Sequence, residues 1–300
     1  GAADMGCQPH QGAGYFPVAD EKHQEFYTEK YGVTHPTKPG LKIPQMFEAA
    51  INKELKGLWI IGEDIVQTDP NSAHVIEAMN SLELLVVQEI FMSETAKLAT
   101  VVLPGTTFLE KDGTFTNTER RIQRVNRAVP PLPGTKPDGL IVTEMMQKLG
   151  FDQPTYDADQ VLAEIADIVP FFKGVTRERL GKFGLQWPVQ EDGTDTKILH
   201  TETFKLGKGR LKNFDWKESS EIEANQKDYP LILTTSRVLQ HYNAATMTRR
   251  TKNINIVDED VLLIHPKDAA HRDLNTGDIG RLYSGRGEVA LKVEVTDKVK

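Results

Sequence analysis

The densest set of side chains able to bind a ligand lies in residues 231–248, where an apolar run leads directly into a polar loop. Leu231, Ile232 and Leu233 have the composition of a buried strand, and we expect them to pack in the core. Hydroxyl, amide, guanidinium and imidazole groups follow, from Thr234, Thr235, Ser236, Arg237, Gln240, His241 and Asn243. Because such groups need hydrogen-bond partners, this loop is suited to hold a polar ligand rather than to pack.

A parallel sheet is expected to position a second group of polar residues. Short apolar runs predict strands at residues 58–61, 84–87 and 100–103, with helices at residues 46–55, 93–98 and 138–149. A further helix after Asp69 should carry Val75, Ile76 and Met79 on one face. This alternation is typical of a parallel sheet covered by helices on both faces. Ligands bind such sheets at the carboxyl ends of the strands, which here are Gly62-Glu63-Asp64, Gln88-Glu89 and Pro104-Gly105.

Composition and charge limit the class of protein. Three hundred residues suit two domains, and no apolar run approaches the roughly 18 residues that span a bilayer. The net charge of −7 argues against general binding to nucleic acid or acidic membranes, so local groups must hold any anionic ligand. The single cysteine, Cys7, excludes an internal disulfide and a cysteine-ligated cluster within these residues, which fits a reducing compartment, and we expect a cytoplasmic location. The chain begins at Gly1 without a signal-peptide pattern and resembles a piece of a longer polypeptide.

The remaining segments suggest how the chain is organised. Residues 1–44 show little periodicity and are expected to be an irregular connection without a core. Residues 151–225 read as a surface excursion and linker around one helix, at residues 158–168. From residue 228 onward the pattern predicts a small all-β domain, with strands at residues 231–234, 261–264, 279–283 and 289–295 and turns at residues 275–278 and 285–287.

Several motifs, in order along the chain, resemble those of the molybdopterin oxidoreductases, and among them the catalytic subunits of formate dehydrogenases. The motifs are GEDIVQTDPN at residues 62–71, VVQEIFMSET at residues 86–95, VVLPG at residues 101–105 and EKDGTFTNTERR at residues 110–121. The resemblance continues through residues 234–248 and through LNTGD at residues 274–278 with GRG at residues 285–287. It therefore covers nearly the whole chain.

The resemblance implies a fold and a cofactor. The fold is α/β, with a Rossmann-like parallel sheet domain at residues 1–225, including the linker at residues 151–225. A small six-stranded double-psi β-barrel domain follows at residues 226–300 and is expected to be truncated. The expected cofactor is a bis-molybdopterin guanine dinucleotide with molybdenum or tungsten, and the expected activity of the whole enzyme is the interconversion of formate and carbon dioxide. In this family the metal-binding cysteine or selenocysteine, its histidine and a 4Fe-4S cluster lie in the N-terminal half, and the catalytic arginine lies shortly before the segment that corresponds to Gly1. By this resemblance we expect no catalytic residue or metal ligand in the present residues.

By position, the resemblance assigns cofactor binding to residues of three regions: Gly62, Glu63, Asp64 and Thr68; Gln88, Glu89, Lys111 and Asp138; and Thr235, Ser236, Arg237, Val238, Leu239, Gln240, His241, Tyr242, Asn243 and Ala244. Carboxylates at strand ends can accept hydrogen bonds from ribose hydroxyls or from the N1 and N2 hydrogens of guanine, which adenine lacks. Successive N–H and hydroxyl groups suit a pyrophosphate because they neutralise it without bulk positive charge. The expected partners are formate or carbon dioxide, and electron-transfer subunits of the iron–sulfur, NAD-reducing or hydrogenase type.

Several of these residues also have a simpler interpretation. Lys111 could pair with Glu110 or Asp112 in a surface salt bridge, and Arg237 could cap a strand. The eight histidines show no compact metal-binding spacing, so His241 is expected to contact phosphate or pterin rather than metal. The basic residues 248–252 could be a solvated surface or touch phosphate or a partner. Cys7 stands where the family usually has a small or apolar residue. For Arg120 and Arg121 we expect packing and ion pairing.

Two other functions share this pattern. A nitrate reductase of the same superfamily has similar loops in this region, and only its metal-ligating residue would distinguish it. A non-catalytic subunit, such as the large peripheral subunit of respiratory complex I, keeps the fold without the cofactor. The EKDG motif at residues 110–113 and the TTSR motif at residues 234–237 favour a cofactor-binding protein.

Overall fold

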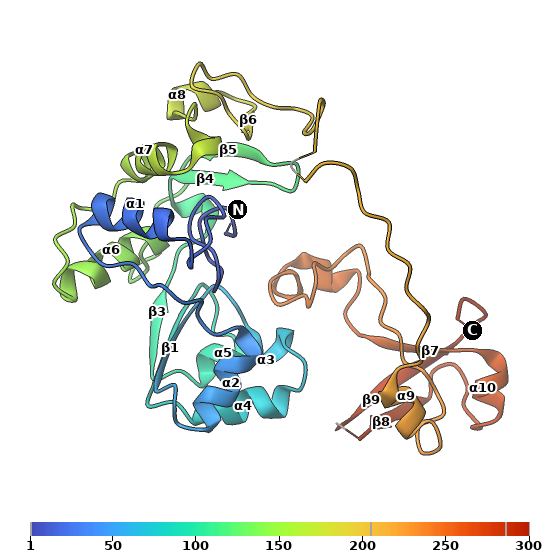
Figure 1. Cartoon of the computed structure of the whole chain (residues 1–300). Coiled ribbons are helices and arrows are strands. Elements are labelled where there is room, and N and C mark those ends of the chain that lie inside the picture. The colour runs from blue at the N-terminus through green and yellow to red at the C-terminus, as the bar shows by residue number, and fades with distance from the viewer. Residues whose placement is uncertain (1, 205, 286, 300) are drawn as a thin grey trace. The chain divides into compact units, whose positions relative to one another are not determined.

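The computed structural model describes residues 2–204, 206–285 and 287–299, and its contacts divide the chain into two compact units (Figure 1). Unit 1 comprises residues 1–66 and 73–209, and unit 2 comprises residues 67–72 and 210–300. Arg286, in the predicted turn at residues 285–287, lies outside the described residues. No helix in the described part of the chain has both the length and the apolar composition needed to cross a membrane.

A three-stranded parallel sheet organises the first half of unit 1. Its strands are β1 (Gly57–Ile61), β2 (Leu84–Glu89) and β3 (Val101–Pro104), in the order β1-β2-β3. The three predicted strands of this sheet are therefore confirmed. The register aligns Ile61 with Gln88 and Gln88 with Leu103, so the three carboxyl ends meet at one edge of the sheet.

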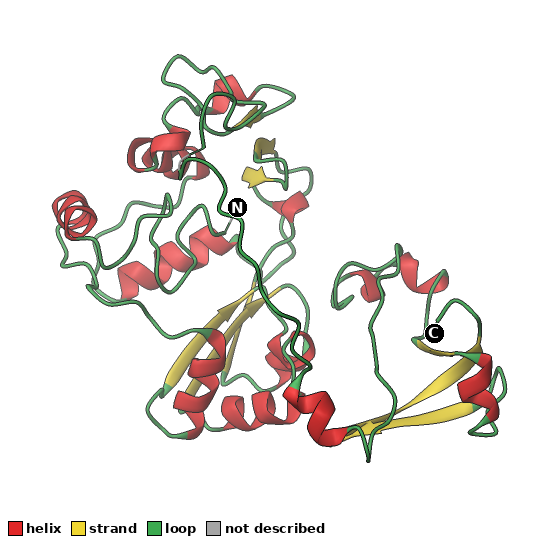
Figure 2. Ribbon diagram, turned by 45° about the vertical axis from the view of Figure 1, so that its right-hand side comes forward, coloured by secondary structure: helices red, strands yellow, loops and turns green. Residues whose placement is uncertain are grey.

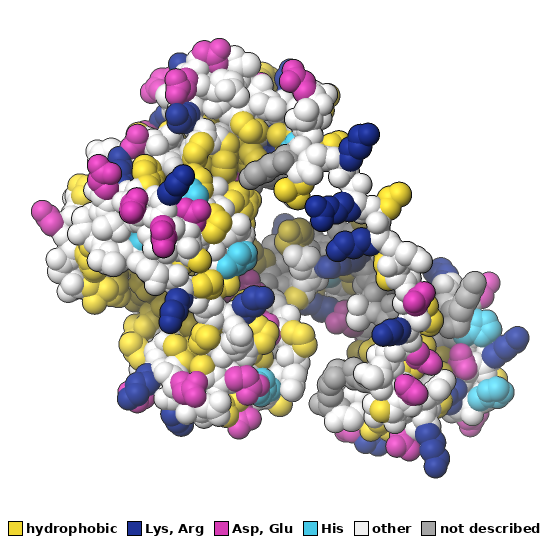
Figure 3. Space-filling view, viewed as in Figure 1, with side chains coloured by type: hydrophobic (Ala, Val, Ile, Leu, Met, Phe, Trp, Pro, Cys, Tyr) yellow, Lys and Arg dark blue, Asp and Glu magenta, His cyan; other side chains and the backbone are white. Residues whose placement is uncertain are grey.

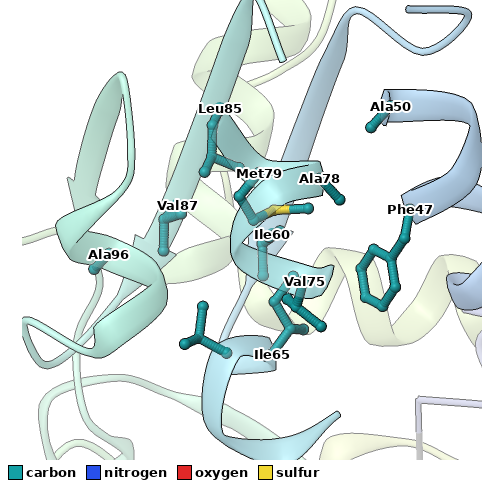
Figure 4. Packing of buried hydrophobic residues seen from close by; sticks show 11 residues of the cluster. Phe47, Ala50, Ile60, Ile65, Val75, Ala78, Met79, Leu85, Val87 and Ala96 are labelled. Carbon is teal, nitrogen blue, oxygen red and sulfur yellow. The ribbon is translucent and has the colours of Figure 1, made fainter. Parts of the chain in front are cut away.

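Helices cover one face of this sheet. They are α2 (Ile43–Ile51), α3 (Ile65–Thr68), α4 (Ser72–Asn80) and α5 (Glu94–Lys97). Figure 4 shows the core that they share with the strands, where Leu85 and Val87 of β2 are 1% and 0% exposed. Val86, which points to the opposite face, is only half-buried, so the expected helical cover on both faces is not found among the described residues. The strand order β1-β2-β3 explains this. Each strand is added on the same side of the previous one, so right-handed crossovers place both connections on the same face of the sheet.

The buried face of helix α4 differs from the predicted one at a single position. Val75 and Met79 are buried as predicted, and Ala78 joins them, because residues three and four apart share a helix face. Ile76 is 37% exposed, since the next position along a helix is rotated by about 100°. The prediction that Ile76 faces the core was wrong.

The N-terminal segment is more ordered than the sequence suggested. Helix α1 (Glu21–Tyr31) begins after Asp20, whose carboxylate accepts a hydrogen bond from the backbone N–H of His23 at 3.2 Å. Tyr27 is 6% exposed and donates its hydroxyl to the backbone oxygen of Ala13 at 2.8 Å. The expectation of a segment without a core was wrong, because α1 is mostly polar and buries one aromatic residue rather than an apolar stripe.

A second core joins α1 to residues that follow the parallel sheet. An antiparallel sheet of β4 (Gly113–Thr116), β5 (Arg121–Val125) and β6 (Leu185–Gln186) packs with α7 (Ala158–Ile168), η2 (Pro170–Phe172) and α8 (Arg177–Leu180). The same half of unit 1 also contains η1 (Phe108–Glu110) and α6 (Asp138–Lys148). Figure 2 shows these elements as short pieces joined by long loops. The buried side chains include Ile122, Leu162, Val169, Phe172, Val175, Leu180 and Val189. Helices α6 and α7 confirm their predictions, but residues between Leu162 and Val189 contribute to a core, so this stretch is not a surface excursion.

Unit 2 contains a small mixed sheet. Its strands are β7 (Val261–Ile264), β8 (Ile279–Ser284) and β9 (Gly287–Val295), in the order β7-β9-β8, accompanied by α9 (Ser220–Asn225), η3 (Thr248–Arg250), η4 (Lys252–Asn255) and α10 (Pro266–Ala270). Strand β9 runs parallel to β7 and antiparallel to β8. Ile264, Ala269 and Val293 form the core. These three strands match their predicted positions.

The fourth predicted strand and the barrel are not found in the described part of unit 2. Residues 231–234 form no strand, and Leu231, Ile232 and Leu233 are 45%, 78% and 62% exposed. A strand is held by hydrogen bonds to a neighbouring strand, and the described residues of unit 2 offer this run no such neighbour. The described sheet of this unit has three strands and does not close into a six-stranded barrel.

Candidate functional site

The carboxyl end of β1 opens onto unfilled space. Gly62 follows the strand with a φ of 64°, a left-handed conformation that glycine adopts without strain, and its N–H donates to the backbone oxygen of Gln88 at 2.9 Å. A Cβ atom built on Gly62 would meet nothing within 4 Å. Glu63 is exposed beside it. This end of the strand therefore has room for a ligand close to the backbone.

Asp64, by contrast, is used internally. It is 4% exposed, and its carboxylate accepts hydrogen bonds from the backbone N–H of Thr95 at 3.0 Å, the Thr95 hydroxyl at 2.7 Å and the backbone N–H of Glu94 at 3.3 Å. These bonds join the end of β1 to the start of α5. The side chain of Asp64 thus stabilises the sheet edge, whereas the carboxylate of Glu63 and the hydroxyl of Thr68 lie on exposed residues.

Gln88, Lys111 and Asp138 meet although they are far apart in the sequence. The Gln88 side-chain amide donates to Oδ1 of Asp138 at 2.8 Å, and the Lys111 ammonium pairs with the other carboxylate oxygen, Oδ2. We name these three residues the strand-end cluster. Gln88 is 1% exposed at the end of β2, while Asp138 is the first residue of α6. The sheet edge therefore presents a carboxylate that is held from two sides.

The partner of Lys111 differs from both simple alternatives, Glu110 and Asp112. Glu110 folds back over η1, where its carboxylate accepts from the backbone and hydroxyl of Thr107 and from the backbone of Leu132. These bonds, first among them the backbone hydrogen bond from Thr107, lower the pKa of Glu110. Lys111 is consequently directed to Asp138 rather than to its neighbours in sequence.

Two buried polar atoms at this edge have no hydrogen-bond partner among the described residues. They are Oε1 of Gln88 and the hydroxyl oxygen of Thr106, a residue that is 2% exposed and follows β3. An unsatisfied buried group costs about 1–3 kcal/mol, which a ligand or water with suitable hydrogens would offset. An acceptor oxygen beside carboxylates fits a group that carries several N–H donors, such as guanine. Thr106 was not singled out in the sequence, where its only signal is its position directly after Pro104-Gly105.

Unit 1 also contains two cavities, of which one adjoins this edge. One of about 270 Å³ borders the strand-end cluster and is lined by Lys111, Asp138, Tyr156, Val161 and Ile165 among others. Burial raises the pKa of Tyr156, with further contributions from nearby carboxylates. A larger cavity of about 620 Å³ lies between α7 and α8 and shares no residue with the strand ends. We place the candidate site at the sheet edge because hydrogen-bonding groups converge there.

The loop at residues 235–244 belongs to unit 2 and is largely exposed. The Arg237 guanidinium donates to the side-chain oxygen of Asn243 at 2.8 Å, and Asn243 has a φ of 50°. His241 is 8% exposed, and its ring nitrogens lie 3.1 Å from the Thr248 hydroxyl and 2.7 Å from the backbone oxygen of Val257. Both nitrogens of His241 are therefore occupied, and its side chain fixes the loop.

The other loop residues are more accessible. Thr235, Ser236, Val238, Leu239, Tyr242 and Ala244 are exposed and Gln240 is half-buried. The backbone oxygen of Gln240 accepts from the side chain of Asn253 at 2.7 Å, which ties the loop to η4. What this loop can offer a ligand is its hydroxyls, its outward backbone groups and the Arg237 fork.

Arginines outside the site are engaged in packing. Arg120 donates to the backbone oxygens of Trp187 and Thr196 and lies over the Trp187 ring, 5.5 Å from its centre. Arg121 pairs with Glu119 at 2.7 Å. The expectation of packing and ion pairing for this pair is confirmed. In the basic run at residues 248–252, Arg249 pairs with Asp260 at 2.9 Å.

Charge around the site is local rather than general. Acidic and basic side chains are interspersed on the face of unit 1 seen in Figure 3. The described residues contain no cluster of three or more histidine, cysteine or acidic side chains placed to hold a metal ion, and Cys7 is exposed. The polar groups at the sheet edge and in the loop are therefore the candidate ligand contacts.

Comparison with known proteins bears on this arrangement. The family model described as molybdopterin oxidoreductase matches residues 4–148, and the model described as molydopterin dinucleotide binding domain matches residues 231–300. The chain belongs to the molybdopterin oxidoreductase family. Both regions that carry the candidate ligand contacts lie within the matched segments of this family.

Relatives in the molybdopterin oxidoreductase family match the chain from end to end. The F420-dependent formate dehydrogenase subunit alpha of Methanocaldococcus jannaschii is 40% identical, over 100% of this chain and 45% of that protein. Probable oxidoreductase YjgC of Bacillus subtilis is 39% identical, over 100% of this chain and 31% of its own length. The chain thus spans less than half the length of these relatives.

A solved structure of the same fold is the acetylene hydratase from Pelobacter acetylenicus. It matches with a TM-score of 0.63 and 20% sequence identity, covering 91% of this chain and 40% of the hydratase. At this identity the match supports the fold alone.

Proposed function

We propose that this chain is the cofactor-binding portion of a molybdenum- or tungsten-dependent formate dehydrogenase, which interconverts formate and carbon dioxide. The observation that carries the proposal is the 40% identity, along the whole chain, to a formate dehydrogenase subunit alpha. Because these residues span 45% of that relative, the activity is proposed for the complete subunit.

In this proposal the sheet edge of unit 1 holds a guanine nucleotide. The carboxylates of Glu63, Glu89 and Asp138 are the acceptors for the N1 and N2 hydrogens of guanine or for ribose hydroxyls. Gln88 adds an oxygen that accepts no hydrogen bond from any described residue. The left-handed backbone at Gly62 leaves room for the nucleotide to approach.

The loop of unit 2 supplies the contacts to a pyrophosphate. We assign this role to the backbone groups and hydroxyls of Thr235 and Ser236 and to Arg237, whose guanidinium is already oriented by Asn243. The match of the dinucleotide-binding model to residues 231–300 supports this role. We place the boundary between the α/β domain and the dinucleotide-binding domain at residues 225 and 226.

When bound, such a cofactor would supply the redox chemistry by which formate becomes carbon dioxide, a proton and two electrons. The contribution of this chain is to bind and orient the organic part of the cofactor. We propose that a 4Fe-4S cluster elsewhere in the subunit and an electron-transfer partner receive the electrons. The names of relatives that are alpha subunits of F420-dependent enzymes support a partner subunit of this kind.

The test uses the full-length subunit. We expect it to reduce a viologen dye with formate and not to oxidise reduced viologen with nitrate. Reduction of nitrate without oxidation of formate would favour the nitrate reductase alternative, and neither activity in protein that contains metal would refute the proposed reaction. Glu89→Ala and Arg237→Ala should lower the content of metal and GMP without changing the preference for formate.

A further inference from the structure

The contacts of Lys111 point inward rather than toward a ligand. Its ammonium pairs with Oδ2 of Asp138, and the side chains of the two residues are 24% and 38% exposed. The amide of Gln88 holds the other oxygen, Oδ1, at 2.8 Å. Each oxygen of the carboxylate therefore has one fixed partner, and its remaining lone pairs face away from both.

A glycine leaves the space that Asp138 occupies. A Cβ atom on Gly105 would lie 3.0 Å from Oδ1 of Asp138, closer than side-chain carbons normally approach. The next nearest atoms, Cγ2 of Ile90 at 3.7 Å and Cγ of Asp138 at 3.9 Å, lie at ordinary contact distances. The φ angle of Gly105 does not lie in the left-handed region. Alanine at this position would therefore push the carboxylate without straining the backbone.

We propose that Lys111 is a positioning residue that, with Gln88 and Gly105, orients the Asp138 carboxylate to select guanine over adenine. This inference rests on the proposed function and changes the role of Lys111 from a cofactor contact to a support for Asp138. A carboxylate held from two sides presents its free lone pairs in one direction. The paired N1 and N2 hydrogens of guanine require an acceptor with such a fixed orientation.

The two roles of Lys111 predict different selectivity. A lysine that touches phosphate stabilises GDP and ADP equally, because both carry the same pyrophosphate. A lysine that orients the base-reading carboxylate affects GDP alone, because adenine has no N1 or N2 hydrogens in the same arrangement. Affinities for the two nucleotides, measured side by side, therefore separate the roles.

The experiment titrates GDP and ADP into the full-length subunit purified from cells that cannot make the pterin cofactor. For Lys111→Met we expect GDP to bind about tenfold more weakly, because Asp138 loses the charge-assisted hydrogen bond from Lys111 that orients it. The affinity for ADP should be unchanged. Lys111→Arg keeps the cation and should restore GDP binding. Gly105→Ala should weaken GDP binding in the same selective way without removing any charge.

Matched controls exist for both kinds of change. Lys136→Met removes a lysine that pairs with Glu144 of α6 at 2.5 Å and does not touch the strand-end cluster. Gly209→Ala adds a Cβ atom that meets nothing within 4 Å. Both controls should bind GDP as the unaltered protein does. In the loaded enzyme, Lys111→Met should also lose the whole cofactor faster on dilution than Lys136→Met, measured as the protein-bound nucleotide that acid later releases.

The measured affinities distinguish a failure of the proposed function from a failure of the positioning role of Lys111. If the unaltered subunit binds neither nucleotide, or prefers ADP, the proposed function and this inference both fail. If it prefers GDP but Lys111→Met binds GDP normally, or loses GDP and ADP affinity equally, the positioning role is overturned while the proposed function stands.

Discussion

Replacement of Asp64 by asparagine tests whether its carboxylate belongs to the fold or to the ligand site. The change keeps the shape of the side chain but removes its charge and turns one acceptor oxygen into an NH2 group. Oxygen Oδ1 can still accept from Thr95, whereas the new amide would face the backbone N–H of Glu94, which now donates to Oδ2 at 3.3 Å. The variant therefore loses one hydrogen bond, weakens two others and places two donors face to face.

The magnitude follows from the burial of this group. Hydrogen bonds to a charged group contribute about 1.5–3 kcal/mol each, and the bond to Glu94 is long, so we expect a loss of roughly 2–3 kcal/mol in local stability. Amide hydrogens in residues 84–96 should then exchange roughly 30- to 160-fold faster. Hydrogen–deuterium exchange measured by mass spectrometry is the appropriate assay because it reports on this sheet separately from unit 2.

The adjacent carboxylate is the control. Glu63 is exposed, so Glu63→Gln should change local stability by no more than about 0.5 kcal/mol while weakening GDP binding. Asp64→Asn should show the opposite pattern. If Asp64→Asn weakened GDP binding and left hydrogen exchange unchanged, Asp64 would be a ligand contact and the reasoning from its hydrogen bonds would be refuted.

Three further predictions concern the cores and the loop. Leu85→Ala should lower the free energy of unfolding, measured with denaturant, by about 2–5 kcal/mol. Leu84 is 46% exposed, so Leu84→Ala should lower it much less, and equal losses would contradict the packing described. His241→Phe should speed hydrogen exchange in residues 241–257, and unchanged exchange would exclude a structural role for its ring. A hydrogen bond to Asp4 raises the pKa of Tyr15 from 10.0 to about 12, so the folded state keeps a proton that the unfolded chain releases. The free energy of unfolding should therefore fall as the pH rises from 10.0 towards about 12, and it should fall less in the Tyr15→Phe variant. Identical pH profiles for the two proteins would contradict this prediction.

The sequence was informative where apolar runs were long enough to show a pattern. The strands β1, β2, β3 and β7 were predicted because Val, Ile and Leu cluster in them. The strands β4, β5 and β6 were missed because they are short and polar at many positions, and their pairing depends on partners distant in the chain. The strand predicted at residues 231–234 was wrong because an apolar run forms a strand only where a neighbour pairs with it.

The candidate site was predictable in its residue types but not in its contacts. Gln88 and Asp138 are 50 positions apart, and Lys111 and Asp138 are 27 apart, so only the fold brings them together. Sequence proximity suggested Glu110 or Asp112 as the partner of Lys111, whereas Glu110 is engaged by backbone groups of its own turn. Likewise, nothing in the sequence indicated that both ring nitrogens of His241 are occupied within its own unit.

The most direct test of the proposed cofactor role is the metal and nucleotide content of the purified full-length subunit. Acid-released nucleotide is identified by chromatography and metal by mass spectrometry. We expect molybdenum or tungsten together with GMP, at the ratio that a bis-guanine dinucleotide cofactor requires, and a reduced content of both in Glu89→Ala. Protein that is folded but carries neither metal nor GMP would contradict the proposal and favour a non-catalytic member of the family.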